Sequence, residues 1–501
     1  MVESVITQIC VIYSGCILTY KNSATLLVSA KGVVFFDSTE GVFMSQITIV
    51  ALVIFAITYL LMMIFQKIRP YIVGASALIF VALGTIATMK PDLFGTDFFK
   101  LGTETFSYGI LDAIGNIDWN VIMMIAGTMG TVYLFIESKM PQLLSDVLIS
   151  KMPNVKWVVV VISLFAGIVS AFVDNVATVL MIAPVALAFC KKLNISPVSA
   201  IICIAVSSNL QGAATLVGDT TSILLGKAAN LDFSSFFVDN GKPGMFWVVE
   251  AGAVVSALII FFMFRKENQK ITFDTRTKVE DYFPTILLVG TVVALIGVSF
   301  IPYKDNAAPG QFYKPDVTNG IICIAFFLIG IIRELLFKKN KEVVKNAFKE
   351  IDYYTIFLLT FLFIVIGGIE KAGVVKVIGD LIASLGAGSP FIVFTIIVWA
   401  SVILSAFIDN IPYTATMLSI VPVIAAGFPD MDPKLLYYGL LCGATLGGNL
   451  TPIGASANIT GIGILRKEGY EVKATTFMKY GVPFTLSAVI TGYLLLWFIW
   501  G

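Results

Sequence analysis

Apolar runs of about 20 residues, almost without charged side chains, recur along the whole of this 501-residue chain. A run of that length crosses a bilayer as one α-helix. Only 13% of the residues are charged and the mean hydropathy is +0.92, which excludes an ordinary soluble enzyme. The clear candidate spans are 44–66, 70–89, 119–137, 245–264, 284–303, 317–337, 352–370 and 480–500.

Four further apolar stretches are interrupted by polar residues. The stretches 155–190 and 390–427 each carry an Asp-Asn pair near the middle, which predicts a re-entrant hairpin that turns at the pair. The stretches 198–226 and 434–464 contain Gly, Asn and Thr at their centres and predict broken helices, because glycine lets a helix unwind. We therefore expect an all-α polytopic membrane protein with about eleven transmembrane helices.

The basic residues predict how the chain is oriented. If both hairpins enter and leave on the same side, 22 Lys and Arg fall on one side and 9 on the other. The richer side is expected to be cytoplasmic and includes the linker 265–283. In the N-terminal segment 1–43, residues 5–19 could form a short first span. We expect a multi-pass protein of a bacterial or archaeal plasma membrane.

The chain repeats itself at a spacing of about 235 residues. The text S-A-F-V-D-N at 170–175 returns as S-A-F-I-D-N at 405–410, and G-A-A-T-L-V-G at 212–218 returns as G-N-L-T-P-I-G at 448–454. An odd number of crossings in each unit turns the second copy upside down, as in secondary transporters whose site lies between the copies. The two units are 44–264 and 284–501.

The polar residues in these stretches form a candidate ion-binding or substrate-binding site. Carboxylate, amide, hydroxyl and carbonyl oxygens are the ligands that hard cations such as sodium prefer. Single Thr and Asn residues could instead join helices, the aspartates could cap helices, and the half-helix N-termini could face an anion. The candidates are Asp174, Asn175, Thr178, Asn209, Thr215, Gly218, Asp219, Asp409, Asn410, Thr414, Asn449, Thr451, Gly454, Ser456 and Asn458.

At these residues the sequence resembles the ion transporter superfamily. The resembling text covers about 118–230 and 352–485, and the signatures are S-A-F-V-D-N-V-A-T-V-L-M-I-A-P-V and L-G-G-N-L-T-P-I-G-A-S-A-N. The branch it resembles holds arsenite permeases, sodium–proton antiporters (ArsB/NhaD) and the P protein, and is related to citrate and dicarboxylate transporters. The resemblance implies a homodimer with an elevator-type moving domain. It also implies sodium sites near Asn175, Gly218, Asn410 and Gly454.

The predicted function is secondary active transport, most favourably cation (sodium)–proton antiport. Histidine is absent, so carboxylates or water must carry the protons. No Lys or Arg occurs in 158–190 or 385–433, so a dianion near Asp174 and Asp409 would meet uncompensated like charge. Apart from sodium ions or protons as coupling ions we expect no cofactor. The expected partners are a small ion or molecule and the lipid bilayer, and not nucleic acid.

Three other functions stay open. The first is a sodium-coupled or proton-coupled transporter of an anion such as a di- or tricarboxylate, or of arsenite. A more distant one is an intramembrane aspartyl protease, because two aspartates in a membrane could share a proton. A passive channel would not need two inverted hairpins that meet at one site. The chain lacks a G-x-x-x-x-G-K loop, so ATP is not the expected energy source.

Overall fold

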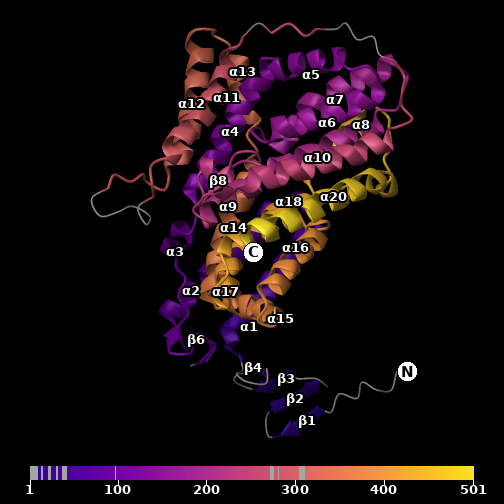
Figure 1. Cartoon of the computed structure of the whole chain (residues 1–501). Coiled ribbons are helices and arrows are strands. Elements are labelled where there is room, and N and C mark those ends of the chain that lie inside the picture. Colours follow the sequence, from indigo (N-terminus) through magenta and orange to yellow (C-terminus); the bar gives the residue numbers. More distant parts are fainter. Residues whose placement is uncertain are drawn as a thin grey trace, which may run out of the picture. The chain divides into compact units, whose positions relative to one another are not determined.

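The computed structural model is dominated by helices (Figure 1). It describes residues 9–12, 15–20, 24–29, 32–36, 42–95, 97–270, 276–279, 281–303 and 311–501. The chain divides into two compact units, each built from segments that are distant in the sequence. The first unit comprises 1–118, 357–385 and 422–427, and the second comprises 119–356, 386–421 and 428–501.

The first unit packs helices of the N-terminal part of the chain with helices from 357–385. Its α1 and α2 contact each other, and α1 also contacts α15. The hydroxyl of Thr48 in α1 donates to the carbonyl of Ala372 at 2.7 Å, and the hydroxyl of Tyr108 donates to the carbonyl of Ile364 at 2.6 Å. The helices are α1 (Gln46–Ile64), α2 (Arg69–Met89), α3 (Ile110–Gly115), most of α14 (Tyr353–Lys371) and α15 (Val374–Leu385).

The N-terminal segment differs from the short helical span expected at 5–19. Residues 9–12 and 15–20 form strands of a five-stranded antiparallel sheet, while 1–8 and 13–14 lie outside the described residues. Fifteen residues as a helix would cover only about 22 Å, less than the apolar core of a bilayer. The strands are β1 (Ile9–Ile12), β2 (Gly15–Tyr20), β3 (Ala24–Ser29), β4 (Gly32–Phe36) and β5 (Val42–Met44).

The second unit holds the interrupted stretches of both repeats. The first hairpin is α6 (Val155–Ser170) followed by α7 (Asn175–Lys192), and the second is α16 (Pro390–Ser405) followed by α17 (Asn410–Ala426), of which 410–421 belong to this unit. The first broken helix is α8 (Val198–Gly212) and α9 (Thr220–Ala228). The second is α18 (Pro433–Gly447) and α19 (Ser456–Lys467).

Packing in this unit follows the repeat. Helix α6 contacts α8, and the equivalent α16 contacts α18; helix α10 (Met245–Met263) lies along its own equivalent, α20 (Ala474–Trp500) (Figure 1). Helix α4 contacts α11 and α12. The remaining helices are α4 (Trp119–Glu137), α5 (Met140–Ser150), α11 (Phe283–Ser299), α12 (Thr318–Leu336) and α13 (Lys341–Lys349).

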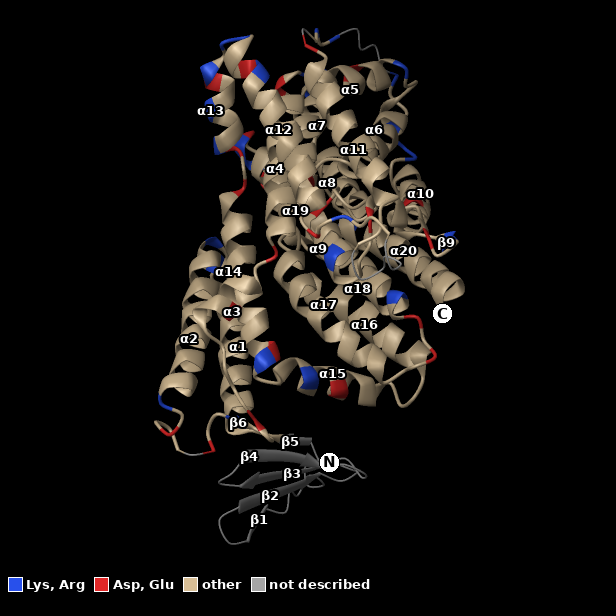
Figure 2. Ribbon diagram, turned by 90° about the vertical axis from the view of Figure 1, so that its left-hand side faces the viewer, with Lys and Arg blue, Asp and Glu red and all other residues tan. Residues whose placement is uncertain are grey.

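Within the described ranges, eight helices are long and apolar enough to cross a membrane, or nine if the bent pair α15–α16 counts as one span. The expected all-helical, multi-span class is confirmed. Helices α6, α8, α11 and α17 are apolar but have only 15 to 17 residues. Within the second unit, Lys and Arg gather at the end that contains α5 and α13 (Figure 2). The cytoplasmic orientation of that end remains a prediction.

Candidate functional site

The first hairpin turns at Asp174, which caps helix α7. Its Oδ2 atom accepts hydrogen bonds from the backbone N–H groups of Val176 at 3.0 Å and Ala177 at 3.2 Å. These are N–H groups that the first turn of a helix cannot bond internally, and a carboxylate there stabilises the helix by about 1 kcal/mol. The sequence predicts that Asp174 either caps a helix or belongs to the binding site, and in the structure it caps α7 and also lines a cavity at the hairpin tip.

The second hairpin turns in the same way. The Oδ1 atom of Asp409 accepts from the N–H of Ile411 at 3.3 Å, at the start of α17. The next residue, Asn410, is 3% exposed, and its side-chain amide donates to Oδ2 of Asp219 at 3.4 Å. The tip of hairpin two is thus bonded to the break between α8 and α9 of repeat one.

At the break of each split helix, a glycine lies against converging carbonyl oxygens. A methyl group on Gly218 would lie 2.6 Å from the carbonyl oxygen of Gly212 and 2.8 Å from that of Ala171. On Gly454 it would lie 2.6 Å from the equivalent oxygen of Gly448 and 2.8 Å from that of Ser405. No side chain fits at either position, so only glycine lets the carbonyl groups approach so closely.

Two threonines brace these breaks at equivalent positions. The hydroxyl of Thr215 donates to the carbonyl of Ala171 at the tip of hairpin one. The hydroxyl of Thr451 donates to the carbonyl of Ala406 at the tip of hairpin two. The repeat found in the sequence is therefore also a repeat of individual hydrogen bonds. Each hairpin tip is bonded to the broken helix of its own repeat.

A chain of buried amides joins the two repeats. Asn175 donates to Oδ1 of Asn209 at 3.0 Å, and Asn209 donates to Oδ1 of Asn449 at 3.1 Å. Asn458 also donates to Oδ1 of Asn449, at 3.3 Å. These side chains are all less than 5% exposed, so each bond replaces one that water would otherwise make.

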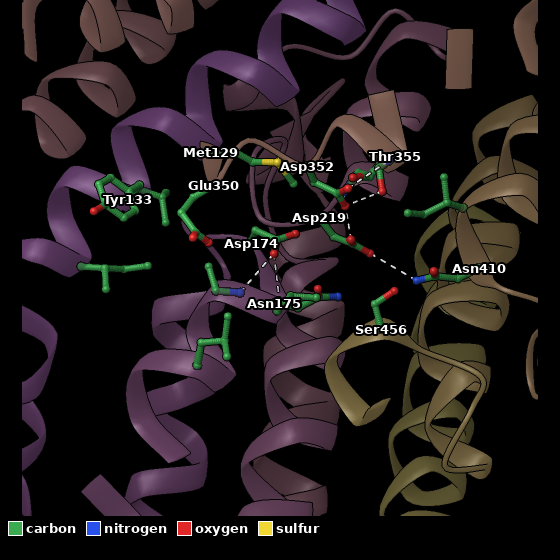
Figure 3. A pocket seen from close by; sticks show the side chains of 17 residues that line it. Met129, Tyr133, Asp174, Asn175, Asp219, Glu350, Asp352, Thr355, Asn410 and Ser456 are labelled. Atoms are coloured by element: carbon green, nitrogen blue, oxygen red, sulfur yellow. Dashed lines mark hydrogen bonds between the residues drawn. The ribbon is translucent and has the colours of Figure 1, made fainter. Parts of the chain in front are cut away.

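A cavity of about 210 Å³ lies at the first hairpin tip (Figure 3). Five of the expected residues line it: Asp174, Asn175, Asp219, Asn410 and Ser456. The other expected residues are not in its wall: Thr178, Asn209, Thr215, Gly218, Asp409, Thr414, Asn449, Thr451, Gly454 and Asn458. Several of these hold the wall in place, as the bonds of Asn209 and Thr215 illustrate.

Two of the expected residues that do not line the cavity are threonines buried in the packed core. The hydroxyl of Thr178 donates to the carbonyl of Val173 at 3.4 Å. The hydroxyl of Thr414 is completely buried and has no hydrogen-bond partner in the described part of the chain. Neither threonine reaches the cavity.

Asp219 is the most enclosed carboxylate of the cavity wall. It is 4% exposed, caps helix α9 by accepting from the N–H of Thr220 at 2.8 Å, and accepts from the hydroxyl of Thr221 at 2.7 Å. With the amide of Asn410, its oxygens have three donors. Three hydrogen bonds stabilise a carboxylate that burial would otherwise disfavour.

Sequence reasoning missed two carboxylates of this wall, Glu350 and Asp352. Both come from the connection between α13 and α14. Asp352 caps α14 by accepting from the N–H of Thr355 at 3.0 Å and from its hydroxyl at 2.6 Å. A signal existed in the sequence, because Ile351-Asp352 repeats the Ile117-Asp118 pair that opens the equivalent run of repeat one. It marked the repeat and did not by itself indicate a position beside Asp174.

The cavity is acidic. Four carboxylates line it, from Asp174, Asp219, Glu350 and Asp352, and among the described residues no Lys or Arg does. The rest of the wall consists of hydroxyls, amides and apolar side chains such as Met129 and Leu180. Such a wall offers oxygen ligands and negative charge to a small cation.

The helical hairpins and broken helices, arranged as two related copies in a multi-pass membrane protein, define a secondary transporter. The chain belongs to the citrate transporter family (CitMHS), whose sequence profile matches residues 60–443. Membership in the ion transporter superfamily, expected from the hairpin and loop signatures, is thereby confirmed.

Relatives support this assignment. The chain is similar to a 46 kDa membrane protein of Mycobacterium leprae, with 29% identity over 66% of this chain and 74% of the relative. An uncharacterized transporter of Mycobacterium tuberculosis is 26% identical over 76% and 86% of the two chains. The human P protein is 25% identical over 67% of this chain and 48% of its own length, so this chain spans about half of that relative.

Solved structures share the fold. The YdaH transporter of Alcanivorax borkumensis superimposes with a TM-score of 0.52 at 14% identity, over 90% of this chain and 97% of that one. MtrF of Neisseria gonorrhoeae superimposes with a TM-score of 0.54 at 15% identity, over 86% and 96%. At these identities the likeness extends to the fold alone.

Proposed function

We propose that this transporter exchanges a cation, most favourably sodium, for protons at the acidic cavity. The observation that carries the proposal is the cavity wall, with four carboxylates and no basic side chain among the described residues. In such a wall a cation and a proton compete for the same oxygens, and that competition is the chemical basis of antiport. The absence of histidine from the sequence leaves carboxylates and water to handle the proton.

Electrostatics favours a cation over a bare organic anion. Two like unit charges about 4 Å apart repel by about 4 kcal/mol at an effective dielectric constant of 20. A dicarboxylate next to Asp174 and Asp219 would meet this repulsion more than once. A sodium ion in the same place is attracted by each carboxylate.

The oxygens around the two glycines support sodium as the coupling ion. Carbonyl groups converge at Gly218 and at Gly454, and the side chains of Asn175 and Asn410, which line the cavity, carry further amide oxygens. Neutral carbonyl and amide oxygens are suitable ligands for a hard cation. We propose one sodium position near each hairpin tip, one at Asn175 and Gly218 and the other at Asn410 and Gly454. A homodimer with an elevator-type moving domain is a further proposal, and it rests on the sequence resemblance.

A second candidate is coupled transport of an anion, which the description of the family as citrate transporters favours. For this chain, an anion would need sodium ions or protons to neutralise Asp174 and Asp219 first. It would then be a symporter that uses the same cavity.

Flux measurements in proteoliposomes test both candidates. Antiport predicts that an added sodium, lithium or potassium gradient moves protons in the opposite direction without any organic solute. Anion transport predicts that labelled citrate or succinate accumulates, and that the cation alone moves no protons. Proton movement that occurs only with the organic anion would reject antiport.

A further inference from the structure

The cavity wall contains matched pairs of residues from the two repeats. Equivalent positions differ by 235 residues at the hairpin tips and by 236 at the broken helices. The matched pairs in the wall are Asn175 with Asn410, Val176 with Ile411, and Thr220 with Ser456. The cavity therefore lies between the two copies, and any difference between its halves comes from positions where the repeat is broken.

The repeat is broken most sharply just after the two close-packed glycines. Repeat one has Asp219 and Thr221, and the equivalent positions of repeat two are Ala455 and Ala457. A carboxylate and a hydroxyl on one side thus correspond to two methyl groups on the other. Tip carboxylates differ as well, because Asp174 lines the cavity and its equivalent Asp409 does not.

The hydrogen bonds of Asp219 cross from one repeat to the other. Its Oδ2 atom accepts a hydrogen bond from Thr221 of the same repeat and another from Asn410 of hairpin two. The hydroxyl of Thr221 lies 3.0 Å from that of Thr445 in helix α18. Asp219, from repeat one, is therefore held between the tip of hairpin two and the broken helix of repeat two.

The tip of hairpin one reaches repeat two only indirectly among the described residues, through the amide of Asn209 and not through a carboxylate. The amide of Asn175 donates to Asn209, a neutral side chain of the same repeat. The backbone carbonyl of Asn175 accepts from the hydroxyl of Ser208, which also belongs to repeat one. Of the two equivalent asparagines, only Asn410 donates to a carboxylate of the cavity.

We propose that Asp219 contacts the cation and links its binding in the cavity to the tip of hairpin two through Asn410. This inference rests on the proposed cation transport. The Asn410–Asp219 bond is 3.4 Å long, beyond the 2.9 to 3.0 Å of a typical N–H···O bond, so it is a weak bond. A cation that takes up Oδ2 displaces the amide and removes the bond that ties this tip to Asp219 of repeat one. In hairpin one the equivalent amide, that of Asn175, donates to the neutral Asn209 and not to a carboxylate.

Thiol labelling at the two tips tests the link. Ile411→Cys and Val176→Cys place matched probes in the wall, in a background whose six native cysteines are replaced and whose transport is retained. The full chain is labelled in proteoliposomes with and without saturating sodium. Losing one hydrogen bond predicts that sodium speeds labelling at position 411 by about 2- to 10-fold. In Asp219→Asn this response is lost, while any sodium response at position 176 is unchanged.

Two variants distinguish the loss of the Asp219–Asn410 link from a simple loss of negative charge in the cavity. Asp174→Asn removes a carboxylate of the same cavity whose hydrogen bonds, among the described residues, come from its own helix. It should shift the sodium concentration needed for the labelling response and keep the full response at position 411. Glu250→Gln removes a carboxylate outside the cavity and should change neither the sodium concentration needed nor the labelling response at position 411. Asn410→Ala removes the bond from the other side and should give fast labelling regardless of sodium, which tests the link even if Asp219→Asn does not fold.

A full sodium response at position 411 in folded Asp219→Asn protein would overturn the inference. So would a sodium-dependent labelling rate in Asn410→Ala equal to that of the parent protein. Failure of the underlying cation transport looks different, because the parent protein itself would then show neither a sodium response nor sodium-driven proton flux.

Discussion

The side-chain amide of Asn209 donates to the backbone carbonyl of Thr445 at 2.7 Å, although 236 residues separate them. The two residues occupy equivalent positions in the two repeats, at the ends of helices α8 and α18 where each begins to unwind. Asn209 also bonds to Asn175 and Asn449, so one buried side chain connects a hairpin tip with both broken helices.

Asn209→Ala is expected to destabilise the protein more than it changes any single binding step. The substitution removes the buried hydrogen bonds that Asn209 makes with the carbonyl of Thr445 and with the side chains of Asn175 and Asn449, although Asn449 keeps its bonds with Asn458 and Val206. A buried polar group that loses its partner costs about 1–3 kcal/mol. The melting temperature of the purified protein in detergent checks this. Asn268→Ala, which removes an amide from an exposed loop, is the control and should change the melting temperature little. Equal melting temperatures for the two variants would contradict the prediction.

Gly218→Ala and Gly454→Ala are expected to abolish or strongly reduce transport. In each, the new methyl group would lie 2.6 Å from a carbonyl oxygen, so the backbone must shift at a cost of about 1–3 kcal/mol. Transport assays on folded protein measure the effect. Gly463→Ala, in helix α19 of the same broken span, places its methyl group in open space and serves as the matched control. Normal transport by Gly454→Ala would show that the close carbonyl approach is dispensable.

Asp174→Asn should fold well and transport poorly. Asparagine caps a helix about as well as aspartate, so the stability of α7 is kept while the cavity loses a charge. Transport should fall severely, or lose its pH dependence if cation binding persists. Asp409→Asn is the natural comparison and should have the smaller effect, because Asp409 caps α17 and does not line the cavity. Flux against pH for both variants decides it, and an unchanged pH profile in Asp174→Asn would argue for a purely structural cap.

Glu350→Gln should distinguish a cationic from an anionic substrate. Glu350 is an exposed residue of the cavity wall, so its charge acts mainly by attracting or repelling the arriving solute. For a cation, the KM should rise by about 2- to 5-fold at low ionic strength with kcat almost unchanged. For an anion, the KM should fall instead. An effect that persists at high salt would point to direct contact with the substrate.

Asp281, in the connection before α11, should make stability depend on pH. Burial favours its protonated form, but bonds from Arg333, Lys338 and the N–H of Phe283 outweigh that effect and lower the pKa of Asp281 to about 2. Because the folded pKa lies below the unfolded value of about 3.9, the stabilisation is complete above that value and is lost as the pH falls towards 2. We expect it to amount to about 1–2 kcal/mol.

Melting temperatures between pH 5 and pH 3 test this prediction. The melting temperature of the parent protein should fall between pH 5 and pH 3, and Asp281→Asn should remove part of that fall. Asp380→Asn, which removes a carboxylate on α15, is the control and should follow the pH profile of the parent protein. Identical pH profiles for the parent protein and Asp281→Asn would show that the Asp281 interactions do not stabilise the fold.

Much of this protein could be predicted from its sequence. Long apolar runs have one stable form in a bilayer, the helix, because every backbone polar group must be bonded internally. The same rule makes an Asp-Asn pair or a glycine-rich break stand out, and the duplicated text predicts two related copies. Asp174, Asn175, Asp219, Asn410 and Ser456 were found in this way, and all five line the cavity.

Only the tertiary structure decided which of the marked residues share a wall. Asp174 and Asp409 look equivalent in the sequence, yet only the first lines the cavity; Glu350 and Asp352 join it from a connection that the repeat did not distinguish. Periodicity and motif spacing determine where a helix begins, breaks and ends, since those are local properties of the backbone. Which side chains meet across helices depends on packing between segments as much as 240 residues apart, as Asn209 and Asn449 show, and no local pattern records it.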